Sequence, residues 1–179
     1  MSEPLSTNGL LARHKTYLPS HSPFPTFAEL IPLGKGPHIL VVTCADPRCI
    51  PENFLGINPG ETIVIRNAGG NPQMALPDIL ALDTLVGIHE IMVVKHTDCG
   101  SLAFTEKGVK DILKQRAPMR EQDINEMDFG SIAGKTLEEG LREQVGYVKG
   151  SELVREELKP NIRSFIHDLV SGTLREVQV

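Results

Sequence analysis

Short apolar runs rich in β-branched residues recur through the middle of the chain. They span residues 39–43, 62–65 and 91–94. Runs of this length and composition are typical of strands buried on both faces, as in a parallel sheet. Between the second and third runs, residues 76–86 show helical spacing, with Pro77 in the first turn and Gly87 after the last. The pattern predicts a strand–helix–strand unit.

The second half of the chain is more polar and predicts further helices. Thr105 is the expected N-cap of a helix that runs to residue 115. Thr136 caps another, whose apolar residues share one face up to residue 148. The residues between these helices, 116–135, predict a loop or a set of short turns.

The end of the chain predicts two paired strands. Apolar and polar residues alternate over 162–170, which predicts a strand. Ser171 and Gly172 then predict a turn into a second strand at residues 174–177. Together, these elements predict an α/β fold: a mostly parallel central sheet flanked by helices, with a C-terminal antiparallel hairpin.

The N-terminal residues differ from the rest in their proline content. Residues 1–37 hold six of the 13 prolines and predict an irregular arm with at most short helices. Composition leaves two interpretations open, a disordered leader and an arm that wraps a neighbouring subunit. Residues 38–179 predict one α/β domain.

Charge and composition exclude several classes of protein. Eighteen basic and 23 acidic side chains give a net charge of −5, with no basic cluster, which argues against nucleic acid or an anionic membrane as partner. No apolar run approaches the roughly 18 residues of a membrane span. Residues 1–8 lack the apolar stretch of a secretory signal, so we expect a cytoplasmic protein.

The three cysteines are an odd number, in a chain too long to need disulfides for stability. We therefore expect a reducing compartment and thiols kept for metal binding or catalysis. Cys44 ends the first apolar run, and Cys99 follows the third run together with His96. Because the carboxyl ends of parallel strands meet at one crevice, these three side chains can converge.

Two thiolates and an imidazole suit zinc. The sequence offers no fourth cysteine or second well-placed histidine. Three protein ligands and one open position are typical of catalytic zinc sites.

Two charged residues lie close to Cys44 in the sequence and admit two interpretations. Asp46 and Arg48 form either a surface ion pair worth under about 1 kcal/mol or a functional pair. In the second case, Arg48 fixes the Asp46 carboxylate, which accepts a hydrogen bond from a metal-bound water.

These motifs together resemble the β-class carbonic anhydrases. They comprise Cys44-x-Asp46-x-Arg48, Arg-Asn-Ala-Gly-Gly at 66–70 and His-Thr-Asp-Cys-Gly at 96–100. Together with the segment 166–172, the sequences of these motifs resemble those of the compact class D branch. That branch also contains hydrolases of carbonyl sulfide and carbon disulfide. The resemblance runs from about residue 38 to the C-terminus and leaves the arm uncovered.

The resemblance implies a site and its ligands. Zinc would be bound by Cys44, His96 and Cys99. Asp46 and Arg48 would form the catalytic pair. In some members the aspartate equivalent to Asp46 becomes a fourth zinc ligand and closes the site. The substrate pocket would include Asn67, Ala68, Gly69, Gly70 and Gly100. Gly70 departs from the Ala-Gly-Asn sequence common elsewhere in the family. This difference implies that the wall of the substrate pocket is altered at Gly70.

The resemblance also implies an activity and partners. Zinc-bound hydroxide would attack carbon dioxide to give bicarbonate. The alternative is hydrolysis of carbonyl sulfide or carbon disulfide at the same zinc, with release of hydrogen sulfide. A third hypothesis is a non-catalytic protein whose zinc is closed by Asp46. Besides the small linear substrate and water, the expected partner is a second copy of the chain, in a homodimer or higher homo-oligomer.

The remaining thiol and histidines predict packing or surface roles. Cys49 is expected to be a bystander, and Asp98 to cap or orient the loop between the ligands. The histidines without ligand spacing are His14, His21, His38, His89 and His167.

Overall fold

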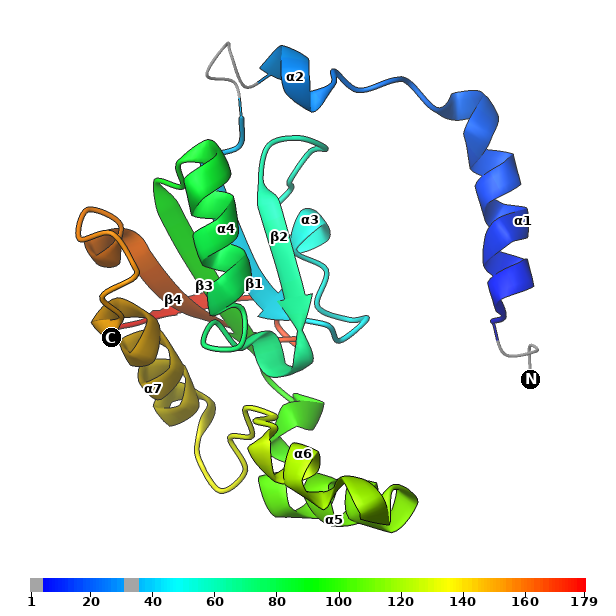
Figure 1. The fold of residues 1–179 in the computed structure, drawn as a ribbon. Helices are drawn as coiled ribbons and strands as arrows, with labels where there is room; N and C mark the ends of the chain where they lie inside the picture. The colour runs from blue at the N-terminus through cyan, green and yellow to red at the C-terminus, as the bar shows by residue number, and fades with distance from the viewer. Residues whose placement is uncertain (1–4, 31–35) are drawn as a thin grey trace. The chain divides into compact units, whose positions relative to one another are not determined.

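The computed structural model describes residues 5–30 and 36–179 and divides the chain into two compact units, Met1–Lys35 and Gly36–Val179 (Figure 1). The predicted arm, residues 1–37, thus falls partly outside the described residues. Within its own unit, α1 (Thr7–Tyr17) begins after Ser6, whose hydroxyl accepts a hydrogen bond from the Gly9 backbone N–H at 3.1 Å. A second short helix, α2, spans Phe27–Leu30.

The larger unit is built on one five-stranded sheet with the order β2-β1-β3-β4-β5. The strands are β1 (Ile39–Cys44), β2 (Ile63–Asn67), β3 (Glu90–His96), β4 (Ile162–His167) and β5 (Leu174–Val177). The first four are parallel, and β5 pairs antiparallel to β4. The predicted fold class is confirmed.

The strand predicted over 162–170 ends earlier, at His167. Asp168 begins a turn there, because its Oδ1 accepts hydrogen bonds from the backbone N–H groups of Val170 and Ser171.

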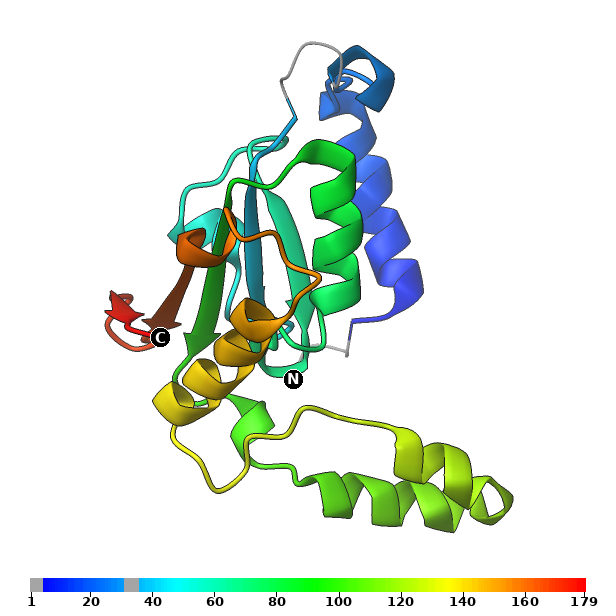
Figure 2. The ribbon, with the colours of Figure 1, turned by 60° about the vertical axis from the view of Figure 1, so that its left-hand side comes forward.

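Helices cover both faces of the sheet. On one face, α4 (Leu76–Val86) and α7 (Leu137–Gly150) pack over an apolar core, and α3 (Pro51–Phe54) lies on the opposite face (Figure 2). The core on the α4 and α7 side includes Leu40, Val42, Ile79, Val93, Leu141, Val145 and Ile166. Strand residues of one parity therefore point toward α4 and α7, and those of the other parity toward α3.

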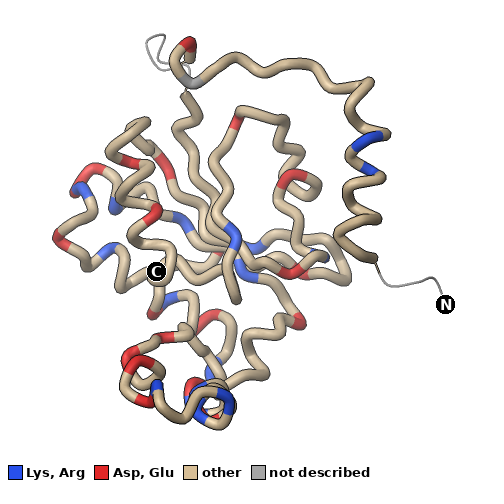
Figure 3. Tube along the Cα trace, turned by 45° about the vertical axis from the view of Figure 1, so that its right-hand side comes forward, with Lys and Arg blue, Asp and Glu red and all other residues tan. Residues whose placement is uncertain are grey.

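A helical hairpin extends from the sheet after β3. It consists of α5 (Glu106–Arg116) and α6 (Glu121–Glu126) and carries side chains of both charges (Figures 2 and 3). The prediction of a loop over 116–135 is wrong where α6 forms. This helix is too short to show periodicity, and its existence depends on Ile124, which is buried in the folded chain. Within the described residues, no helix has the length and apolar character needed to cross a membrane.

The parallel register brings three strand ends to one edge. Cys44 of β1 lies opposite Asn67 of β2, and Thr43 lies opposite Val94 of β3. His96 therefore ends β3 just beyond the end of β1. This carboxyl edge of the sheet holds the candidate functional site.

Candidate metal centre

Three side chains with metal-binding atoms converge at the ends of β1 and β3. The Sγ atoms of Cys44 and Cys99 and a ring nitrogen of His96 all lie within 4.8 Å of one another. Both cysteines are 6% exposed and His96 is fully buried. Two thiols and an imidazole at this spacing can hold one metal ion. The structure thus brings together the three residues predicted as ligands.

The ring of His96 is held in a ligand-like orientation. Its Nδ1 lies 2.8 Å from the Thr97 carbonyl oxygen, and because a carbonyl only accepts, Nδ1 must carry the proton. Nε2 is then the free acceptor, and it is buried without a hydrogen-bond partner of normal geometry among the described residues. Such an atom costs about 1–3 kcal/mol unless something binds it. A metal ion at Nε2 would satisfy it.

The two thiols lie within hydrogen-bond distance, with their Sγ atoms 3.7 Å apart. The hydrogen bond from Cys44 lowers the pKa of Cys99, and the Ser101 hydroxyl, 3.1 Å away, adds to the effect. The same hydrogen bond, together with burial, raises the pKa of Cys44. The pair therefore favours the thiolate form at Cys99, and metal binding would release the proton that remains.

Protonation of His96 is also biased by its surroundings. Burial opposes the charged ring, but the Thr97 carbonyl and the nearby negative charges of Cys99 and Asp46 act in the opposite direction, and the pKa of His96 is raised. The site is therefore rich in negative charge and attracts a cation. A divalent metal ion competes there with the proton for the same nitrogen.

Asp46 is held beside the cluster by Arg48. The backbone N–H and Nε of Arg48 donate to Oδ1 at 2.8 and 3.0 Å, and Nη2 donates to Oδ2 at 2.7 Å. These hydrogen bonds hold the pKa of Asp46 well below its usual range, so the carboxylate is ionised throughout the neutral range. Its Oδ2 lies 3.8 Å from Nε2 of His96. Of the two interpretations, this geometry favours the functional pair over a surface ion pair.

Arg48 also fixes the loop that follows β3. Its Nη1 donates to Oδ2 of Asp98 at 2.7 Å, and Nη2 donates to the Asp98 carbonyl at 3.0 Å. Asp98 has φ of +55°, a left-handed conformation that few residues other than glycine adopt. Asp98 thus orients the loop through its contacts with Arg48.

Arg66 holds the loop after β1, a role that its sequence position did not indicate. Its Nε donates to the Cys44 carbonyl at 3.1 Å, and its Nη2 donates to the carbonyls of Asp46 and Cys49 at 2.7 and 3.1 Å. These partners are backbone atoms 17 to 22 positions away, so no side-chain motif marks them.

A tight turn after β2 packs directly behind the ligands. Gly69 and Gly70 have φ of +74° and +58°. A Cβ on Gly70 would lie 2.9 Å from the backbone N of Cys44, and one on Gly69 would lie 2.8 Å from Cβ of Ser101. Both positions need glycine because the turn approaches the ligand loops so closely.

The other residues predicted for the substrate pocket lie around this turn. The side chain of Asn67 bridges it: Oδ1 accepts from the Asn71 N–H at 2.7 Å, and Nδ2 donates to the Asn71 carbonyl at 2.8 Å. Ala68 and Gly100 are exposed. Contact of residues 67–70 and Gly100 with a substrate stays a prediction.

Lys95 is a second charged residue that sequence reasoning missed. It directly precedes His96 and is only 2% exposed, with Nζ donating to the Gly69 carbonyl at 2.8 Å. Burial lowers the pKa of Lys95 to about 8, while the charges of Cys99 and Cys44 act in the opposite direction. The burial of Lys95 could not be predicted, because the sequence of an apolar strand does not show how deeply a lysine within it is buried.

Cys49 and His167 do not belong to the cluster of ligand atoms. Cys49 is fully buried, 3.4 Å from the Thr43 hydroxyl, and burial raises its pKa. His167 is buried and stacks on Phe54. His38 and His89 stack on each other. His14 and His21 belong to the N-terminal unit, where both contact the ring of Tyr17.

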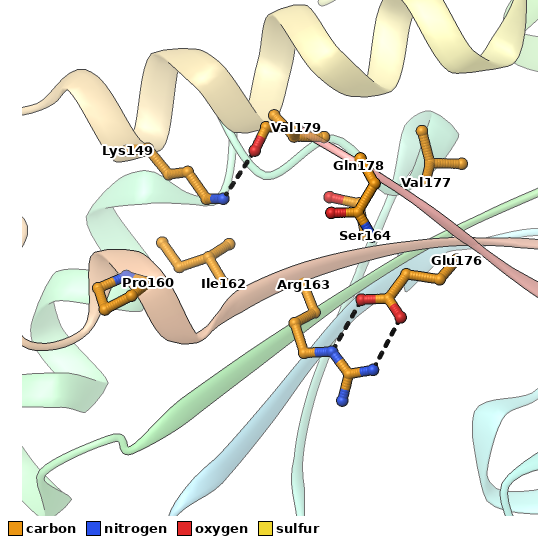
Figure 4. A pocket seen from close by; sticks show the side chains of 9 residues that line it. All are labelled: Lys149, Pro160, Ile162, Arg163, Ser164, Glu176, Val177, Gln178 and Val179. Atoms are coloured by element: carbon orange, nitrogen blue, oxygen red, sulfur yellow. Dashed lines mark hydrogen bonds and ion pairs between the residues drawn. The ribbon is translucent and has the colours of Figure 1, made fainter.

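One of the cavities among the described residues lies away from the Cys–His–Cys cluster. It has a volume of about 250 Å³ beside the β4–β5 hairpin, where Arg163 pairs with Glu176 and Lys149 donates to the Val179 carbonyl at 3.2 Å (Figure 4). None of the three candidate metal ligands, Cys44, His96 and Cys99, lines this cavity. The chemistry of the chain is therefore assigned to the carboxyl edge and not to this cavity.

The sheet order and the Cys–His–Cys cluster define an α/β protein with a metal-binding centre at the carboxyl edge of a parallel sheet. The sequence profile of the carbonic anhydrase family matches residues 39–174. β-Carbonic anhydrase 1 of Mycobacterium tuberculosis is 30% identical over 152 residues, which are 84% of this chain and 88% of that protein. The chain belongs to the β-carbonic anhydrase family, a family of enzymes.

Two further relatives agree with this assignment. A carbon disulfide hydrolase from an Acidianus species is 38% identical over 89 residues, 44% of each chain. The solved structure of a carbonic anhydrase from Glaciozyma antarctica has a TM-score of 0.79 and 25% identity, and it covers 96% of this chain and 98% of that one. The predicted resemblance is confirmed, including the relation to carbon disulfide hydrolases.

We predict that Cys44→Ser abolishes metal binding, because a serine hydroxyl stays protonated and cannot replace a thiolate. The measurement is zinc content by mass spectrometry after loading and desalting, with Cys49→Ser as the matched control. The control should keep its metal. A full zinc content in Cys44→Ser would show that the ligand assignment is wrong.

Proposed function

We propose that the chain is a zinc-dependent carbonic anhydrase that converts carbon dioxide and water into bicarbonate and a proton. The observation that carries this proposal is the cluster of Cys44, His96 and Cys99, all within 4.8 Å, with an ionised carboxylate at its rim. Zinc is the metal that this donor set favours. When bound, zinc would supply the Lewis acidity that makes water a nucleophile near neutral pH.

The residues around the cluster support an open, catalytic site. Both carboxylate oxygens of Asp46 are engaged by Arg48, and this restrains Asp46 from turning onto a metal as a fourth ligand. Oδ2 remains able to accept a second hydrogen bond on the side of His96. We infer that Asp46 orients the attacking water by accepting its hydrogen bond and that Arg48 keeps the carboxylate ionised and in place.

A second candidate function is favoured by one finding, the likeness to carbon disulfide hydrolase over residues in about half of the chain. Carbon dioxide, carbonyl sulfide and carbon disulfide are all linear. Hydrolysis of carbonyl sulfide gives carbon dioxide and hydrogen sulfide. Pocket contacts that separate such substrates are worth only about 1–3 kcal/mol.

The direct test is to compare the substrates on one zinc-loaded preparation. We expect stopped-flow hydration of carbon dioxide to exceed hydrogen sulfide release from carbonyl sulfide or carbon disulfide. Cys44→Ser serves as the blank for both assays. Sulfide release without carbon dioxide hydration would favour the hydrolase instead. Full zinc with no turnover of any substrate would favour the non-catalytic hypothesis.

We predict that Asp46→Asn keeps its zinc but lowers kcat/KM for carbon dioxide by at least about tenfold, because an amide cannot replace the ionised acceptor. Asp98→Asn is the matched control: it removes a carboxylate that Arg48 also contacts, but an exposed one. Its effect should stay below about fivefold. Equal losses in the two variants would argue against a specific role of Asp46.

We also propose that the chain forms a homodimer or higher homo-oligomer through its N-terminal unit. No residue of α1 is buried. The large apolar side chains at least half exposed in this unit are Leu5, Leu10, Leu11, Tyr17, Leu18 and Phe24. Covering a leucine is worth about 1.5–3 kcal/mol, so a second copy would gain substantially by burying this unit.

We predict that the double variant Leu10→Ser and Leu11→Ser dissociates at concentrations where the wild type is oligomeric, because it loses the apolar contact area of two leucines. Sedimentation velocity measures the change. Leu153→Ser, at a leucine that is 71% exposed in the other unit, is the control and should stay assembled. A wild type that is an active monomer would contradict the proposal.

The cysteines support a cytoplasmic setting. All three are free thiols in the structure, and two of them form the candidate metal site. Thiols used in this way persist in a reducing compartment.

A further inference from the structure

Lys95 is a deeply buried charge that the proposed reaction does not use. It is 2% exposed, and in the sheet it lies opposite Ile166, a residue of the apolar core. Its Nζ donates to the Gly69 carbonyl at 2.8 Å. An ammonium group taken out of water is costly, and one neutral carbonyl does not offset that cost.

The opposing charge comes from the metal ligands. Lys95 directly precedes the ligand His96 in β3 and is buried at the same edge of the sheet as the two thiols. A positive charge buried close to thiolates stabilises them. No carboxylate hydrogen-bonds to Lys95 among the described residues.

The turn at Gly69 and Gly70 connects Lys95 to both ligand loops. The Gly69 carbonyl accepts from Lys95. A Cβ on Gly69 would lie 2.8 Å from Cβ of Ser101, whose hydroxyl is 3.1 Å from Sγ of Cys99, and a Cβ on Gly70 would lie 2.9 Å from the backbone N of Cys44. A shift of this turn would therefore disturb the backbone of Cys44 and the hydrogen bond of Cys99.

We propose that Lys95 is a positioning residue for the metal centre: its buried ammonium clamps the Gly69 turn and balances the charge of the two adjacent thiolates. The inference rests on the zinc site of the proposed function. It concerns how tightly the centre holds its metal, which is measured without substrate.

The test is the zinc affinity of Lys95→Met, measured by competition with a chelator. Methionine fills a similar volume without charge or donor. We expect zinc to bind about 10- to 100-fold more weakly, the range found when groups that support metal ligands are removed. The metal-free variant should unfold at no lower temperature than the wild type, because an apolar side chain replaces a buried charge.

Two further variants separate charge, hydrogen bond and packing. Lys95→Gln keeps a donor for the Gly69 carbonyl but loses the charge, so its zinc affinity should fall between those of the wild type and Lys95→Met. Ser164→Ala is the matched control, since Ser164 is equally buried on the next strand but lines the cavity of Figure 4. Its zinc affinity should not change.

A spectroscopic readout reports on the sulfurs directly. In the cobalt(II)-substituted protein, the thiolate-to-metal charge-transfer band depends on how strongly hydrogen bonds and positive charge stabilise the sulfur electrons. The band should move to lower energy in Lys95→Met and stay in place in Ser164→Ala.

Unchanged zinc affinity and an unchanged band in Lys95→Met would overturn the proposal. If Lys95→Met does not fold, wild-type values of both in Lys95→Gln would overturn the charge-balancing role. A wild type that binds no zinc would instead refute the proposed function, and a wild type that binds zinc tightly without turnover would leave the role of Lys95 intact.

Discussion

The parallel pairing of β1 with β3 is the constraint on which the candidate centre depends. Thr43 lies opposite Val94 in this pairing, so the chain leaves both strands at the same edge, with Cys44 and His96 at their ends. A slip of one residue would turn the side chain at each strand end to the opposite face of the sheet. The apolar core under α4 and α7 prevents such a slip, because Leu40 and Val93 would then leave it.

Charge is the second requirement, since the carboxyl edge gathers two thiols and a carboxylate with little access to water. Arg48 neutralises Asp46 from the exposed side, and Lys95 lies near the thiols on the core side. Arg66 adds hydrogen bonds to the backbone of the ligand loop. These three cations hold the loops in place and leave the region between the ligand atoms for a metal ion.

Much of this arrangement could be predicted from the sequence, because it depends on local patterns. Apolar runs marked the parallel strands, and the placement of Cys44, His96 and Cys99 after them marked a metal site. The roles of Lys95 and Arg66 could not be predicted, because their partners are backbone carbonyls supplied by the folded chain. Helix α6 was missed for a similar reason: one turn and a half of helix is stabilised by tertiary packing and leaves no periodic signal.

The central claim is that two thiolates and one imidazole of this chain bind zinc and leave the fourth position to a non-protein ligand. X-ray absorption at the zinc edge of the loaded protein tests it most directly. The account predicts two sulfur neighbours at about 2.3 Å and two lighter neighbours at about 2.0–2.2 Å. A zinc ion with no sulfur neighbour, or with three or four, would contradict it.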